Sequence, residues 1–317
     1  MTANDGTGGP CLGAGHTLAE IATQPGLWAR AAKLAAEPPA DLAAALPRPG
    51  ERVAIAGCGT SWFVAQAYAE LRERAGHGWT DAFAASEFPY GRAYDRIVVL
   101  TRSGTTTECL DLLTRLRTTS PDVPATAITG SPGTPVVGAV RHLVMLDWAD
   151  EESVVQTRFA TTALALLRAH LGEDLAAAVR DAADALAEDL PGDLVAAEQF
   201  TFLGTGWTVG LAAEAALKMR EAATAWTEHY PAMEYRHGPI SIAAPGRVTW
   251  VLGAVPDGLA ADVAATGGRL VTAPDRDPMA ELVRIQRLAA AVAYARGLDP
   301  DRPRNLTRSV ILGQEQQ

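Results

Sequence analysis

Short apolar runs alternate along the chain with longer amphipathic segments. The runs with the character of buried strands are 96–100, 125–129, 142–146, 248–252 and 269–272, together with two that end at Gly57 and Gly204. Apolar periodicity near 3.6 residues predicts helices at 62–74, 108–117, 154–170, 174–190, 209–224 and 279–295. This alternation of strand and helix predicts an α/β fold with parallel sheets covered by helices on both faces.

The chain contains an internal similarity. A strand, a Gly-x-Gly turn and a helix occur first around Gly57 and Gly59, and again 147 positions later around Gly204 and Gly206. A length of 317 residues also exceeds the size at which one core usually stops growing. Both observations predict a duplicated α/β unit.

The composition is that of a globular protein and argues against nucleic acid and membranes as partners. Hydrophobic residues make up 48% and charged residues 20%, which is typical of a globular chain. The net charge of −10 argues against nucleic acid or anionic membranes as partners. Because there is no apolar run of about 18 residues and no signal peptide, we expect a cytoplasmic protein.

The sequence offers little for metals or nucleotide cofactors. Cys11, Cys58 and Cys109 lack CxxC spacing, and the histidines form no HxxxH pair, so we expect neither a disulfide framework nor a metal site. The dinucleotide fingerprint needs a third glycine where Trp62 and Val209 stand, and there is no Walker pattern. We therefore expect no cofactor.

Two hydroxyl-rich clusters follow predicted strands and open predicted helices. They are Gly59-Thr60-Ser61 and Thr101-Arg102-Ser103-Gly104-Thr105-Thr106-Thr107. Helix amino termini present free N–H groups and partial positive charge, and Arg102 adds a full charge. Serine and threonine also serve as ordinary helix caps, but together the clusters favour a phosphate site.

The helix after the second glycine turn carries three charged residues on one face. Glu214, Lys218 and Glu221 have the spacing i, i+4, i+7, and Lys218 is one of only two lysines in the chain. Such a stripe is often a solvated surface, but this helix is otherwise nearly all apolar. Carboxylates beside a buried amine suit proton transfer near neutral pH. His237, before a Gly-Pro turn, is a candidate proton shuttle.

At these residues the sequence resembles the sugar isomerase (SIS) domain superfamily, in the double-domain form of the isomerase half of glucosamine-6-phosphate synthase. The motifs that carry the resemblance are Glu20-Ile-x-x-Gln-Pro25, Cys58-Gly-Thr-Ser61, Ala85-Ser-Glu-Phe88, Ser103-Gly-Thr-Thr106, Glu152-Ser-Val-Val-Gln-Thr157, Glu214-x-Ala-Leu-Lys218-x-x-Glu221, Tyr235-Arg-His-Gly-Pro239 and Pro303-Arg-Asn-Leu306. The resemblance implies two tandem SIS domains, each a flavodoxin-like or Rossmann-like three-layer sandwich. The expected division is a disordered tail (1–17), a first domain (18–172), a connecting helix (173–193), a second domain (194–296) and a carboxyl-terminal tail (297–317).

The resemblance also implies roles for individual residues. The residues expected to bind the substrate phosphate are Gly59, Thr60, Ser61, Thr101, Arg102, Ser103 and Thr106, and those expected to bind the rest of the sugar are Gln156, Thr157 and Arg308. Glu221 would move a proton between C1 and C2 through an enediol, with Lys218 and Glu214 beside it. His237 would open the sugar ring in the neighbouring subunit, which implies a homodimer.

Departures from the family pattern limit what can be transferred. The glutaminase domain is expected to be missing, and Cys11 is not an amino-terminal nucleophile. The lysine that forms a Schiff base in glucosamine-6-phosphate synthase is Arg308 here, and a guanidinium cannot form an imine. Arg158 stands where the family often has lysine, and Arg102 replaces a common glutamine.

The sequence thus predicts an aldose–ketose isomerase, or an amino-sugar-phosphate isomerase/deaminase, that acts on a hexose 6-phosphate. Related stand-alone proteins include deaminases and fructosamine-phosphate deglycases, and the sequence does not choose among them. One alternative is a non-catalytic sugar-phosphate regulator, which would need only the phosphate cluster. Another is the isomerase subunit of a glucosamine-6-phosphate synthase that lacks its glutaminase domain.

Overall fold

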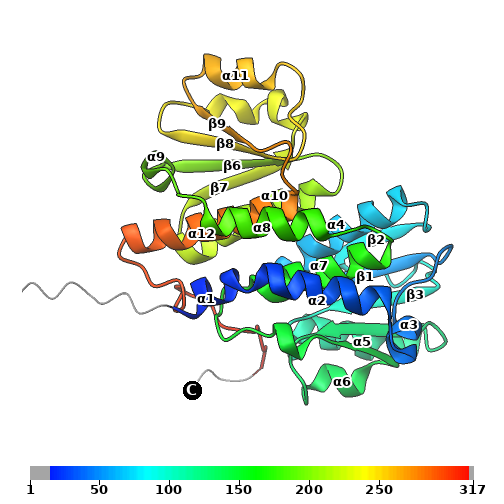
Figure 1. Ribbon diagram of the computed structural model, residues 1–317. Coiled ribbons are helices and arrows are strands. Elements are labelled where there is room, and N and C mark those ends of the chain that lie inside the picture. The colour runs from blue at the N-terminus through cyan, green and yellow to red at the C-terminus, as the bar shows by residue number, and fades with distance from the viewer. Residues whose placement is uncertain (1–14, 314–317) are drawn as a thin grey trace, which may run out of the picture.

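A computed structural model describes residues 15–313, and it has two parallel β-sheets with helices on their faces (Figure 1). The first sheet has the strand order β2-β1-β3-β4-β5 and the second the order β7-β6-β8-β9. The strands of the first sheet are β1 (Val53–Gly57), β2 (Thr80–Ala84), β3 (Arg96–Leu100), β4 (Ala125–Thr129) and β5 (His142–Met145). Those of the second are β6 (Gln199–Gly204), β7 (Trp226–Pro231), β8 (Arg247–Leu252) and β9 (Arg269–Thr272).

Twelve α-helices and four short 3₁₀ helices connect the strands of the described chain. The α-helices are α1 (His16–Ala22), α2 (Gln24–Ala36), α3 (Ala40–Ala45), α4 (Thr60–Arg74), α5 (Thr107–Thr119), α6 (Pro135–Ala139), α7 (Arg158–His170), α8 (Ala176–Ala187), α9 (Gly192–Val195), α10 (Thr208–Ala223), α11 (Leu259–Ala265) and α12 (Pro278–Ala295). The 3₁₀ helices are η1 (Ala85–Glu87), η2 (Asp147–Ala149), η3 (Glu234–His237) and η4 (Pro239–Ile242).

The helices form layers around and between the sheets. Figure 1 shows α5 and α6 outside the first sheet, α11 outside the second, and α2, α4, α7, α8, α10 and α12 between the two sheets. The middle helices pack directly on one another, with α4 against α10 and α8 against both α2 and α12. At the crossing of α4 and α10, a Cβ atom on Gly210 would lie 2.5 Å from the carbonyl oxygen of Phe63. Glycine therefore permits the close approach that brings the side chains of α10 to the end of the first sheet.

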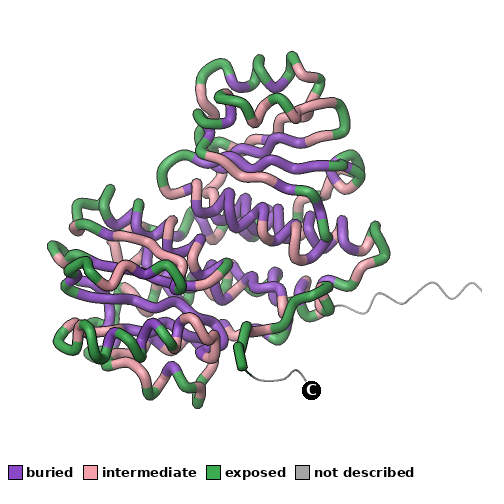
Figure 2. The backbone as a smooth tube through the Cα atoms, turned by 180° about the vertical axis from the view of Figure 1, so that it is seen from behind, coloured by how far each residue is buried: buried purple, intermediate pink, exposed green. Residues whose placement is uncertain are grey.

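The largest hydrophobic cluster fills this middle layer and includes residues of both sheets. Trp28, Tyr68 and Phe159 come from the first part of the chain, and Phe200 and Trp250 from the second, and all five are fully buried. Figure 2 shows the buried backbone concentrated in the strands and in the helices between the sheets. Smaller clusters lie under α5 and under α11. The two sheets therefore share one continuous core.

The structure confirms the α/β class with parallel sheets. Three expected segments differ. The connecting helix expected at 173–193 is α8, which ends at Ala187, followed by the separate short helix α9. The helix predicted from 154 begins at Arg158, because the buried Glu151 carboxylate accepts hydrogen bonds from the backbone N–H groups of Thr157 and Arg158. The expected disordered tail (1–17) is wrong for residues 16 and 17, which open α1 and donate to Asp301. Its remaining part up to residue 14, and residues 314–317, lie outside the described residues.

Over residues 15–313, none of the helices combines the length and the apolar character needed to cross a bilayer.

Candidate active site

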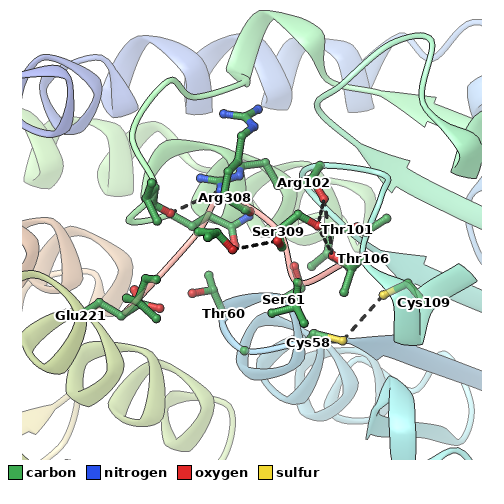
Figure 3. Close-up of a pocket in the computed structure, with 18 residues that line it drawn as sticks. Cys58, Thr60, Ser61, Thr101, Arg102, Thr106, Cys109, Glu221, Arg308 and Ser309 are labelled. Atoms are coloured by element: carbon green, nitrogen blue, oxygen red, sulfur yellow. Dashed lines mark hydrogen bonds between the residues drawn. The ribbon is translucent and has the colours of Figure 1, made fainter. Parts of the chain in front are cut away.

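A cavity of about 200 Å³ opens at the carboxyl ends of β1 and β3, next to Glu221 near the carboxyl end of α10 (Figure 3). It is lined by every residue predicted to bind phosphate, namely Gly59, Thr60, Ser61, Thr101, Arg102, Ser103 and Thr106. Gln156, Glu221 and Arg308 line it as well. The cavity thus brings together residues from five separate stretches of the chain.

Two helix amino termini point at this cavity. Gly59, at φ +54°, makes the turn from β1 into α4, which begins at Thr60. Thr106 precedes the first residue of α5. Gly104, at φ +64°, lies so close to Thr134 that a Cβ atom there would be 2.1 Å from the Thr134 hydroxyl. Both ends direct the positive end of a helix dipole at the cavity, which favours an anion there.

The second hydroxyl cluster is joined by a residue that sequence reasoning missed. The Ser309 hydroxyl lies 3.1 Å from that of Ser103, 3.0 Å from that of Thr105 and 3.3 Å from that of Thr106. The carboxyl-terminal segment is held there because the backbone N–H of Thr107 donates to the carbonyl of Val310. In the sequence, Ser309 lies about 200 residues from its partners in a segment with no helix or strand pattern, so no local signal marked it.

Arg102 lies at the cavity, but its guanidinium is occupied by the protein. It donates to the carbonyls of Ser153 (2.9 Å), Val154 (3.3 Å) and Arg308 (3.0 Å). It also lies 3.5 Å from the buried carboxylate of Glu151. The positive charge expected to bind phosphate is therefore largely committed to ordering the loop 151–157 and the carboxyl-terminal segment.

Gln156 and Thr157, both expected to bind the sugar, differ in their position relative to the cavity. Thr157 does not line the cavity, since its hydroxyl donates to Glu151 at 2.8 Å. Gln156 lines the cavity, and its buried side-chain nitrogen has no hydrogen-bond partner among the described residues. An unsatisfied buried donor is costly, so Gln156 is a strong candidate for contact with a polar ligand.

The three charged residues of α10 form a buried cluster next to the cavity. The Lys218 ammonium donates to the Thr60 hydroxyl at 2.9 Å, forms a close ion pair with Glu221, and lies 3.4 Å from Glu214. Glu214 and Lys218 are 1% exposed, whereas Glu221 is only half-buried and reaches the cavity. Lys218 thus links the first hydroxyl cluster to the only carboxylate that lines the cavity among the described residues.

Burial of Glu214 raises its pKa to about 7, although the Lys218 ammonium opposes the shift. The folded state therefore binds this proton more tightly than the unfolded state, whose carboxyl pKa is near 4.5. We expect the free energy of unfolding, relative to Glu214→Gln, to fall by up to about 3 kcal/mol as pH rises from 4.5 to 7. Urea unfolding of both proteins across this range measures the difference, and parallel pH curves would contradict it.

Of the two remaining predicted site residues, Arg308 lines the cavity and His237 does not. The Arg308 guanidinium lies at 2.6 Å from the Asp150 carboxylate and 3.3 Å from the Ser131 hydroxyl, at the rim of the cavity. His237, the last residue of η3, is exposed and is absent from the cavity of its own chain.

No family model matches the chain. Among curated proteins, it is 28% identical over 319 residues to the glutamine–fructose-6-phosphate aminotransferase (isomerizing) of Gloeobacter violaceus, which covers 83% of this chain and 52% of that protein. The glutamine–fructose-6-phosphate aminotransferase (isomerizing) of Xanthomonas campestris pv. campestris is 30% identical over 327 residues, which again cover 83% of this chain and 52% of that protein. The chain therefore spans about half the length of the curated relatives it matches.

Solved structures show the same fold. Glucosamine-6-phosphate deaminase from Thermotoga maritima has a TM-score of 0.80 at 22% identity, covering 94% of this chain and 100% of the other. The C-terminal domain of glucosamine-fructose-6-phosphate aminotransferase from Francisella tularensis has a TM-score of 0.78 at 22% identity, covering 92% and 99%. Tagatose-6-phosphate ketose/aldose isomerase from Escherichia coli has a TM-score of 0.75 at 17% identity, covering 96% and 98%. The resemblance found in the sequence is confirmed.

Proposed function

We propose that this chain is a phosphosugar isomerase, or isomerase/deaminase, that acts on a hexose 6-phosphate. The observation that carries the proposal is the cavity in which Glu221 faces two hydroxyl clusters at helix amino termini. A similar fold in proteins named as a deaminase and as a ketose/aldose isomerase supports the same class of substrate. We also propose that each sheet with its helices is one SIS domain, divided near residues 173–193.

The phosphate binds, in this proposal, between the amino termini of α4 and α5. Thr60, Ser61, Ser103 and Thr106 line the cavity there, and each carries a hydroxyl group that can donate to the phosphate. The acidic net charge of the chain is no obstacle, because the local field at two helix termini is positive. Arg102 acts as a positioning residue, since its donors already hold the loop 151–157.

Glu221 acts as the base. It takes the proton from C2 of the aldose while O1 gains a proton, which forms a cis-enediol. It then gives a proton to C1 while O2 loses its proton, so the carbonyl moves from C1 to C2. Lys218 is well placed to stabilise the negative charge that develops on the sugar oxygens, because its ammonium is buried next to Glu221 and Thr60. In an amino sugar the C2 amine would become an imine, whose hydrolysis releases ammonia.

His237 completes the site only from another subunit in this proposal. It is exposed on η3 and lies outside the cavity of its own chain, as the sequence resemblance implies for a homodimer. Schiff-base formation through residue 308 is left out of the proposal, because Arg308 stays protonated and is paired with Asp150.

Proton NMR in heavy water tests the proposal. The full-length protein is incubated with glucose, fructose, glucosamine, galactosamine and fructosamine 6-phosphates. Deuterium entering at C1 or C2 of one sugar would support an isomerase, and loss of the amine would identify a deaminase. Binding to a phosphosugar without exchange would instead favour a regulator, and absence of any binding would overturn the proposal.

A further inference from the structure

Two cysteines with no role in the proposed reaction face each other in the wall of the cavity. Cys58 directly follows β1, and Cys109 lies in the first turn of α5. Their sulfur atoms are 3.9 Å apart (Figure 3), and both residues line the cavity. The two positions are 51 residues apart in the sequence, so only the fold brings the thiols together.

The two thiols differ in their surroundings. Cys58 is partly exposed, whereas Cys109 is 1% exposed. The hydrogen bond from Cys109 is the main factor that lowers the pKa of Cys58, and a backbone bond from Ala85 acts in the same direction. The same contact and burial raise the pKa of Cys109, and the Glu108 carboxylate disfavours both thiolates. This asymmetry suits an attacking thiol at Cys58 and a resolving thiol at Cys109.

A bond between these sulfur atoms would change the phosphate cradle, by which we mean the members of the two hydroxyl clusters that line the cavity, namely Thr60, Ser61, Thr101, Ser103 and Thr106. A disulfide is about 2.05 Å long, so the sulfur atoms would have to approach by about 1.9 Å. Cys58 is two residues before Thr60, and Cys109 is three residues after Thr106. Because both cysteines line the cavity beside these residues, the bond would alter the wall against which phosphate is proposed to bind.

We propose that Cys58 and Cys109 form a reversible disulfide, driven by a peroxide, that disables the phosphate cradle. With a peroxide, the Cys58 thiolate attacks one oxygen and becomes a sulfenic acid, and the displaced hydroxide takes a proton to leave as water. The Cys109 sulfur then attacks the Cys58 sulfur and displaces a second water, so that two thiols are oxidised and one peroxide is reduced. The effect on phosphate rests on the proposed function, but formation of the bond does not.

The first measurement needs no ligand. The full-length protein is treated with hydrogen peroxide, denatured, alkylated and mapped by mass spectrometry. We expect a linked pair of peptides that contain Cys58 and Cys109, lost on treatment with dithiothreitol and absent from Cys58→Ser and Cys109→Ser. Failure to detect the linkage, under conditions that oxidise the thiols, overturns the proposal.

The second measurement compares reduced and oxidised protein in binding glucosamine 6-phosphate and fructose 6-phosphate by calorimetry. We expect oxidation to weaken binding at least tenfold and dithiothreitol to restore it. Cys58→Ser, which lacks the attacking thiol, should bind equally before and after peroxide treatment. A linked protein with unchanged affinity would overturn the regulatory effect. If the reduced protein binds neither sugar, the proposed function is at fault, and the mapping still decides whether the disulfide forms.

Discussion

Replacing Glu221 with glutamine should reduce proton exchange at C1 and C2 by about three orders of magnitude, the usual contribution of a general base. Glutamine keeps the size of the side chain but cannot accept the C2 proton at neutral pH. The proposed phosphate donors lie at the start of α4 and in the loop between β3 and α5, away from Glu221 on α10, so affinity for the sugar phosphate should change by less than about threefold. Deuterium exchange by NMR and calorimetric binding measure the two quantities on the same samples.

The matched control is Glu198→Gln, which removes an exposed carboxylate just before β6. It should exchange protons at the rate of the unaltered protein. If Glu221→Gln retained exchange, Glu221 would not be the base. If Glu221→Gln lost both exchange and binding, the loss could not be assigned to proton transfer. It would instead show that the ion pair between Glu221 and Lys218 is needed to keep Lys218 on the Thr60 hydroxyl.

Much of the fold could be predicted because the central strands are apolar on both faces. β3 and β4 begin and end as predicted, and β1, β6 and β8 are buried along their lengths. The edge strands β2 and β7 were missed, since each is largely half-buried or exposed and carries polar residues. Their position beside β1 and β6 depends on pairing with distant strands, which local periodicity does not report.

Site residues that directly follow a glycine turn or share one helix face could be predicted from the sequence. Those that depend on contacts between distant parts of the chain could not. The glycine turns and hydroxyl runs marked the cradle, and the spacing of α10 marked Glu214, Lys218 and Glu221. No such pattern could reveal that Arg102 is held by carbonyls, because these belong to residues about 50 and 206 positions away. Ser309 and the contact between Cys58 and Cys109 escaped for the same reason.

Lys218→Met should abolish catalysis and destabilise the fold at once. Lys218 is 1% exposed, and its ammonium is the positive charge that faces Glu214 and Glu221 at close range. Removing one partner of a buried ion pair leaves an uncompensated charge and costs about 3–5 kcal/mol. Urea unfolding measures this loss, and Lys33→Met is the matched control, since the only other lysine of the chain lies exposed on α2.

A double variant separates the two effects. In Lys218→Met/Glu214→Met the buried carboxylate is removed with its partner, and apolar replacements of similar volume often recover the stability lost by breaking a buried pair. We therefore expect the double variant to regain most of the free energy of unfolding while proton exchange stays at least a hundredfold reduced. Recovery of both would mean that Lys218 only balances Glu214. Recovery of stability alone, together with retained exchange in Glu214→Met, would assign the ammonium to the chemistry beside Glu221, because Glu221 itself is unchanged in both variants.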